Sequence, residues 1–137
     1  MNRNDELSGT FVLVHPDLTY DPENRKNQIG MISSAEVEND NVMVSFGKDG
    51  QGLFSADALL VLKKGHEISY NAVRDARDMD VKDFKEIMAV GNLADSRLTK
   101  DQRTAVEMAK ANPKVLEYSM ATLEDELGLK HEYSLAR

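Results

Sequence analysis

The sequence has no cysteine and no tryptophan. Without cysteine the protein cannot form disulfide bonds, thiolate zinc sites, iron–sulfur centres or a cysteine nucleophile. Aromatic residues of any kind are scarce, at 6% of the 137 residues. Several classes of metal and catalytic site are therefore excluded before any motif is considered.

The sequence also lacks a long hydrophobic run. Its longest, residues 58–62, is far shorter than the roughly 20 residues that span a bilayer. The polar residues 1–6 show no apolar core of the kind that a secretory signal requires. We therefore expect a cytoplasmic protein that has no contact with membranes.

The composition that is present is typical of a globular domain. With 41% hydrophobic and 30% charged residues, the sequence lies outside the range of weakly hydrophobic, highly charged polypeptides that stay disordered. Its 24 acidic residues outnumber its 17 basic residues and give a formal net charge of −7. This balance disfavours nucleic-acid binding, which depends on Lys and Arg side chains that neutralise phosphates.

Residues 9–64 alternate apolar and polar side chains in the manner of short β-strands. The predicted strands are residues 11–14, 29–37, 41–46, 53–54 and 59–62. Asp49 and Gly50 are the turn pair predicted to join the third strand to the fourth. Residues 55–58 are predicted to form a short helical turn. We expect five antiparallel strands that close into a small β-barrel.

Residues 66–130 change to a helical spacing of apolar side chains. Asp80 is the predicted N-cap of a helix that ends near Gly91, and Ser69 is the predicted N-cap of a short helix before it. We expect three to four helices packed against the barrel as one compact α+β unit. The segments predicted to be tails are residues 1–8 and 131–137.

Two capping patterns locate the remaining helices. Thr99 and Gln102 have the spacing of a capping box, in which each side chain bonds a free backbone N–H of the other residue. Asn112 followed by Pro113 predicts an N-cap and a first helical residue. The next helix is predicted to be continuous up to Gly128. Its predicted apolar seam consists of Leu116, Met120, Leu123 and Leu127.

Segments 9–14, 28–32, 41–46 and 52–62 combine glycines with alternating apolar residues. In this pattern the first half of the sequence resembles a small Src-homology-type β-barrel, the group that includes Tudor and KOW-like modules. The resemblance covers roughly two fifths of the sequence, and it implies a binding module more often than an enzyme. The partners it implies are peptides, modified side chains, nucleic acids or neighbouring domains.

Four aromatic residues lie in or beside the predicted barrel, namely Phe11, Tyr20, Phe46 and Phe54. In Tudor-like modules, rings at the barrel mouth bind methylated cations, because ring faces attract positive charge. The three phenylalanines fall within apolar strand patterns and are predicted to belong to the core. Tyr20 lies in a polar loop, so it is the aromatic residue that we assign to a ligand surface.

Tyr118 is predicted to lie about 200° around its helix from Leu116, opposite the apolar seam. Val115 lies beside that seam. An exposed tyrosine with a neighbouring valine is a candidate contact for a partner, since tyrosine is enriched in protein interfaces. The alternative is that both residues pack on the barrel or on an adjacent helix, and the sequence leaves both open.

No motif points to a cofactor, a metal or a catalytic group. The carboxylates between residues 75 and 86 alternate with Arg and Lys, lack the EF-hand spacing, and indicate a solvated helix face. The three histidines are far apart and have no ligand spacing. The glycine-rich residues 47–52 lack the Lys-Ser/Thr pair of a P-loop and predict a turn.

These observations favour a non-catalytic interaction module that binds a protein partner or a second copy of itself. The alternative is a nucleic-acid-associated protein that uses the KOW-like barrel, and a further alternative is an enzyme of a type that the sequence does not reveal. The basic residues that would contact nucleic acid are Arg25, Lys26, Lys48, Lys63 and Lys64.

Overall fold

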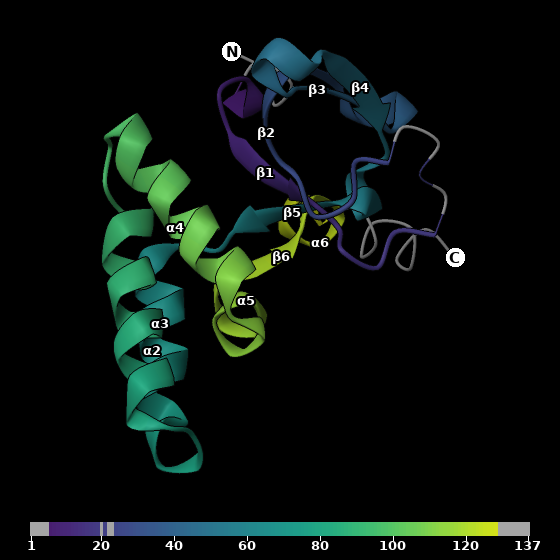
Figure 1. Cartoon of the computed structure of the whole chain (residues 1–137). Helices are drawn as coiled ribbons and strands as arrows, with labels where there is room; N and C mark the ends of the chain where they lie inside the picture. Colours follow the sequence, from purple (N-terminus) through teal and green to yellow (C-terminus); the bar gives the residue numbers. More distant parts are fainter. Residues whose placement is uncertain (1–5, 20, 22–23, 129–137) are drawn as a thin grey trace. The chain divides into compact units, whose positions relative to one another are not determined.

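The computed structural model describes residues 6–19, 21 and 24–128 of the protein (Figure 1). The protein forms two compact units, each described by itself below. The sheet unit comprises Met1–Val61 and Thr122–Arg137, and the helical unit comprises Leu62–Ala121. Within the described residues, no helix is both long enough and apolar enough to cross a bilayer.

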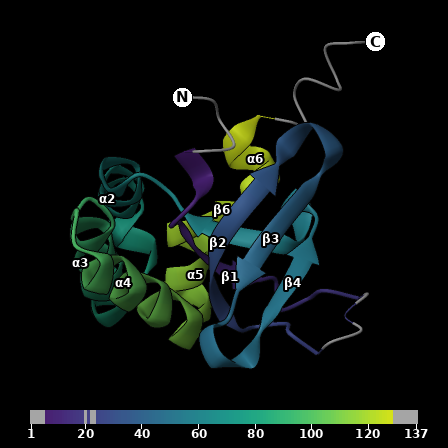
Figure 2. The same cartoon turned by 90° about the horizontal axis from the view of Figure 1, so that it is seen from above.

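The protein is of mixed α+β class and contains an antiparallel sheet of six strands. In sequence order these are β1 (Phe11–Val14), β2 (Ile29–Glu36), β3 (Asn41–Ser45), β4 (Gln51–Phe54), β5 (Leu59–Leu62) and β6 (Met120–Thr122). Their order across the sheet is β4-β3-β2-β1-β5-β6, and Figure 2 shows β2, β3 and β4 as neighbouring strands.

The expected closed barrel of five strands is not what the described residues form. Closure requires the two edge strands to pair with each other. Here β4 and β6 are the two ends of an open order, and β6 adds to the edge that β5 would have used for closure. The five predicted strands are present, and the sixth lies in a segment that was predicted to be helical.

The alternation of apolar side chains locates the core of the sheet unit. In β3, Val42 and Val44 are buried while Asn41 is exposed. β1 contributes Val12 and Val14 to the same core. The remaining buried members are Ile32, Ala56, Leu59, Val61 and Leu123. The turn before β4 is a short 3-10 helix, Gly47–Asp49, that ends at Gly50 with φ of 93°.

The prediction of one continuous helix from Pro113 up to Gly128 is wrong. This segment is divided into α5 (Pro113–Ser119), the short strand β6 and α6 (Leu123–Leu127). The carbonyl of Ser119, which a continuous helix would use internally, accepts the backbone N–H of Lys63 at 2.9 Å. Thr122 then starts α6, since its hydroxyl accepts the N–H of Asp125 at 3.1 Å.

The helical unit contains α2 (Gly65–Arg74), α3 (Val81–Ala94), α4 (Thr99–Ala111) and α5, together with the 3-10 turn η4 (Ala76–Asp78). α3 packs against α2, α4 and α5. The helix predicted to follow Asp80 begins where expected, and the helix for which Ser69 is the predicted N-cap begins earlier, at Gly65, with Lys64 in the N-cap position. With α6 of the sheet unit, the described residues contain five α-helices.

Gly91 does not end α3, which continues to Ala94. Instead Gly91 lies where α3 crosses α2. A Cβ atom on Gly91 would come within 2.6 Å of Ser69 Oγ and 3.1 Å of the Gly65 carbonyl, and one on Gly65 would come within 2.2 Å of the Gly91 carbonyl. The two glycines therefore permit close contact between the two helix backbones.

The ends of the helices use capping contacts that join separate elements. Asn112 is confirmed as the N-cap of α5, because its Oδ1 accepts the N–H of Lys114 at 2.9 Å. The predicted capping box of Thr99 and Gln102 is wrong. Gln102 Nε2 instead donates to the carbonyls of Ala94 and Ser96, at 2.7 Å each, where α3 ends and needs donors.

Candidate binding site

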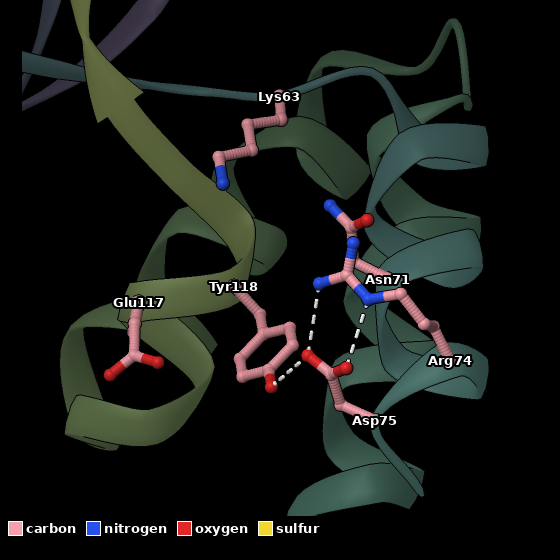
Figure 3. Close-up of a pocket in the computed structure, with 6 residues that line it drawn as sticks. All are labelled: Lys63, Asn71, Arg74, Asp75, Glu117 and Tyr118. Carbon is pink, nitrogen blue, oxygen red and sulfur yellow. Dashed lines mark hydrogen bonds and ion pairs between the residues drawn. The ribbon is translucent and has the colours of Figure 1, made fainter.

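A small pocket lies in the helical unit beside the C-terminal end of α2 (Figure 3). Its volume is about 180 Å³. The lining residues are Lys63, Asn71, Arg74, Asp75, Glu117 and Tyr118. They come from three places in the sequence: the segment before α2, the last turn of α2, and the last turn of α5.

Local structure brings these side chains together. Asn71 and Arg74 are three residues apart on α2, so they lie on one face of the helix. Asp75 directly follows as the C-cap of α2. Because the backbone N–H of Lys63 donates to the carbonyl of Ser119, the segment before α2 is held beside the end of α5.

Asp75 is the centre of the hydrogen bonding in the pocket. Arg74 donates to it twice, from Nε to Oδ1 at 2.9 Å and from Nη2 to Oδ2 at 3.0 Å. Tyr118 Oη donates to Asp75 Oδ2 at 2.6 Å. Figure 3 shows the guanidinium and the phenol on two sides of the carboxylate. Charge-assisted bonds of this kind are stronger than neutral ones.

These contacts change the titration of all three groups. The hydrogen bonds from Arg74 and then from Tyr118 hold the pKa of Asp75 at about 2. The hydrogen bond that Tyr118 donates to Asp75 raises the pKa of Tyr118 above its usual value. The hydrogen bonds that Arg74 donates to Asp75 likewise raise the pKa of Arg74. At neutral pH the pocket therefore contains an ionised carboxylate, a protonated phenol and a charged guanidinium.

Two large side chains on α2 are exposed, Tyr70 at 68% and Val73 at 60%. Tyr70 lies four residues before Arg74 and shares its helix face, whereas Val73 lies farther around the helix, three residues after Tyr70. After Asp75 and Tyr118, Tyr70 also acts electrostatically to raise the pKa of Arg74. The site thus combines a partly buried tyrosine, an arginine and a neighbouring exposed tyrosine.

The structure separates the three residues predicted to be partner contacts. Tyr118 lines the pocket and is partly buried. Val115 has no exposed surface, so its side chain packs inside the protein. Tyr20 lies outside the described residues. Sequence reasoning missed Arg74 and Asp75 as members of the site, because 43 residues separate Asp75 from Tyr118.

The five basic candidates divide between the two units. Arg25, Lys26 and Lys48 belong to the sheet unit, and the other two belong to the helical unit. Arg25 Nη2 donates to the carbonyl of Asp49, and its guanidinium lies 4.5 Å from the centre of the Phe46 ring. Lys26 and Lys48 are exposed on the two segments that Arg25 joins. In the helical unit, Lys63 lines the pocket and Lys64 is exposed.

A second small pocket, of about 170 Å³, lies in the sheet unit near His15 and Asp57. His15 Nδ1 accepts the backbone N–H of Asp17 at 3.1 Å, and Ser55 Oγ donates to Asp57. No hydrogen bond joins His15 to Asp57 or Ser55 among the described residues, so the relay needed to activate a serine is not formed there. The described residues also contain no group of three or more His, Cys, Asp or Glu arranged to hold a metal ion.

Comparisons of the sequence and structure with protein-family models, with curated proteins and with solved structures found no match.

Proposed function

We propose that the protein is a non-catalytic interaction module whose helical unit binds a protein partner. The observation that supports this most is the surface of α2, where Tyr70 and Val73 are exposed and Tyr70 shares a helix face with the pocket residue Arg74. Tyrosine and arginine are, with tryptophan, the residue types most enriched among the energetic centres of interfaces. The cytoplasmic location expected from the sequence is part of this proposal.

The experiment compares two sets of exposed apolar residues. The double variant Tyr70→Ser, Val73→Ser changes the α2 surface. Leu53→Ser is the matched control, because Leu53 is 60% exposed but lies in the sheet unit. A partner recovered by affinity capture is purified, and its dissociation constant is measured with each variant.

We expect the double variant to weaken binding at least about tenfold, as for loss of an interface centre, and the control to leave the dissociation constant unchanged. Sedimentation of the protein alone distinguishes a second copy from a different protein. A protein that stays monomeric and retains no partner would contradict the proposal, as would equal losses in both variants.

A second candidate function is nucleic-acid binding by the sheet unit. It is favoured by one contact, since the bond from Arg25 to the Asp49 carbonyl holds the loop of Lys26 near the turn of Lys48. The double variant Lys26→Gln, Lys48→Gln tests it. If the function holds, binding of single- or double-stranded oligonucleotides falls in this variant, and the salt dependence of wild-type binding is log-linear. The absence of binding at low salt would remove this candidate.

A further inference from the structure

The pocket beside α2 contains hydrogen-bond donors that have no acceptor among the described residues. The ammonium of Lys63 and the side-chain amide of Asn71 line the pocket and make no hydrogen bond or ion pair with any described residue. Arg74 uses Nε and Nη2 for Asp75, which leaves Nη1 available. Figure 3 shows Lys63 reaching toward the pocket from the segment before α2.

The charges around these donors define the ligand. Lys63 and Arg74 supply two positive charges, and Asp75 and Glu117 supply two negative charges. The carboxylate of Asp75 is already bonded to Arg74 and Tyr118, whereas Glu117 points away from the guanidinium in Figure 3. The charges of the lining residues therefore cancel, and the ammonium of Lys114, 5.5 Å from the centre of the Tyr118 ring, adds one net positive charge. A single negative charge balances it, and a dianionic phosphate would be repelled by the two nearby carboxylates.

The size of the pocket points to a small group. Its volume of about 180 Å³ is below the roughly 300–1,000 Å³ that is usual for small-molecule and cofactor sites. The side chain of Arg74 is 57% exposed, so the site is reached directly from the surface. A group that enters here is the end of a side chain or the end of a polypeptide.

We propose that this pocket binds a carboxylate group presented by an acidic segment of a different protein. The carboxylate accepts hydrogen bonds from Lys63 Nζ, Asn71 Nδ2 and Arg74 Nη1, and the neighbouring part of the partner packs on Tyr70 and Val73. A second copy of the protein is disfavoured as the partner, because two whole molecules of net charge −7 repel each other, whereas an acidic segment of another protein needs to place only its carboxylate at the locally positive pocket. The inference rests on the proposed function and adds the chemistry of the partner to it.

The test is a titration of the isotope-labelled full-length protein, followed by NMR at constant ionic strength. Sodium acetate stands for an Asp or Glu side chain, N-acetylglycine for the C-terminus of a polypeptide, and inorganic phosphate for a phosphorylated residue. Sodium chloride is the reference. The signals observed are the Asn71 side-chain amide, Arg74 Nε–H and the Lys63 side chain.

We expect saturable shifts with acetate or N-acetylglycine, with a dissociation constant on the order of 10 mM because so few atoms make contact. Tighter binding of acetate assigns the site to a side chain, and tighter binding of N-acetylglycine assigns it to a polypeptide end. Lys63→Gln should weaken the binding about fivefold. Lys110→Gln, which changes an exposed lysine on α4 that does not line the pocket, should have no effect.

Three results overturn the inference: shifts no larger than those with chloride, tighter binding of phosphate than of either carboxylate, or equal losses in the two lysine variants. Failure of the inference is distinguishable from failure of the proposed function. If a purified partner binds through Tyr70 and Val73 but Lys63→Gln leaves its affinity unchanged, the pocket assignment is wrong and the interaction function stands. If acetate binds but no partner exists, the pocket is real and the interaction function is wrong.

Discussion

The phenol of Tyr118 lies 2.6 Å from the Asp75 carboxylate, although 43 residues separate the two in the sequence. This hydrogen bond joins the last turn of α5 to the C-cap of α2. It also directs the phenol toward a carboxylate that Arg74 already binds. The contact thus fixes Tyr118 and Asp75 against each other on one side of the pocket. It also couples the ionisation of Asp75 to folding.

The first prediction concerns acid. The folded-state pKa of Asp75 is lowered to about 2 by the hydrogen bonds from Arg74 and Tyr118, whereas an unfolded Asp titrates near about 3.9. A lowered pKa contributes stability that is fully present above the unfolded value and is lost as the pH falls toward the folded value. We therefore expect the free energy of unfolding to fall between pH 4 and pH 2, partly because of Asp75.

The measurement is denaturant unfolding at a series of pH values, with Asp75→Asn as the variant. The variant should be less stable than the wild type at pH 6, and the difference should shrink as the pH falls through this range. Tyr118→Phe should raise the Asp75 pKa, read from its carboxyl carbon by NMR. A difference that stays constant from pH 6 to pH 2 would show that Asp75 does not contribute in this way.

The second prediction concerns Gly91. Replacement of a helical glycine by alanine normally adds up to about 1 kcal/mol of stability. Here we expect the opposite, a loss of about 1–3 kcal/mol, because the new Cβ would lie within 2.6 Å of Ser69 Oγ and 3.1 Å of the Gly65 carbonyl. Asn92→Ala, at the next and exposed position of α3, is the control and should be neutral or slightly stabilising. Thermal unfolding of both variants shows whether Gly91→Ala stabilises or destabilises the protein.

The third prediction concerns Gln102. Its amide nitrogen donates to the carbonyls of Ala94 and Ser96, so Gln102→Glu replaces a donor by a negative charge without a change of shape. We expect a loss of about 1–3 kcal/mol, because these carbonyls are left facing an acceptor. Gln102→Met, which removes the donor without adding charge, should lose less. Equal stability of wild type and Gln102→Glu would contradict the contact.

The fourth prediction separates the two roles of Asn112. Its Oδ1 caps α5, while its Nδ2 donates to Asp83 and Glu86 at 3.0 and 3.1 Å. Asp is as good an N-cap as Asn, so Asn112→Asp preserves the cap and places a third carboxylate beside two others. We expect a loss of about 1–2 kcal/mol in both Asn112→Asp and Asn112→Ala.

Salt distinguishes the two losses. Added salt should recover part of the stability of Asn112→Asp, because it screens repulsion among carboxylates, and should recover none in Asn112→Ala. If Asn112→Asp is as stable as the wild type, the contacts to α3 contribute nothing and the cap alone matters. Denaturant unfolding at low and high salt provides the comparison.

The first five strands follow from local sequence. The alternation around Val42 and Val44 is a pattern of near neighbours, and the structure keeps it. The break between α5 and α6 was not predictable in this way, because Leu116, Met120, Leu123 and Leu127 fit a continuous helix equally well. A distant contact, between the Lys63 N–H and the Ser119 carbonyl, accompanies the break. Thr122, three residues before Asp125, was the one local sign of a new helix start.

The candidate site was predictable only in part. The angular position of Tyr118 on its helix suggested that it lies away from the core, and it does line a pocket. Nothing in the local pattern indicated that Asp75 is its partner, because that pairing depends on how α2 and α5 pack. For Val115 the angular position was misleading. A position about 100° from the seam is compatible with an accessible side chain, but the side chain of Val115 is buried.

The first backbone amide of α2, that of Gly65, is capped by a residue distant in the sequence. It donates to Asp95 Oδ1 at 2.9 Å, immediately beyond the end of α3. The beginning of one helix therefore depends on the completion of another that is synthesised 30 residues later. A nascent polypeptide that stops short of residue 95 lacks this acceptor, so α2 gains its full N-terminal support only after α3 has emerged.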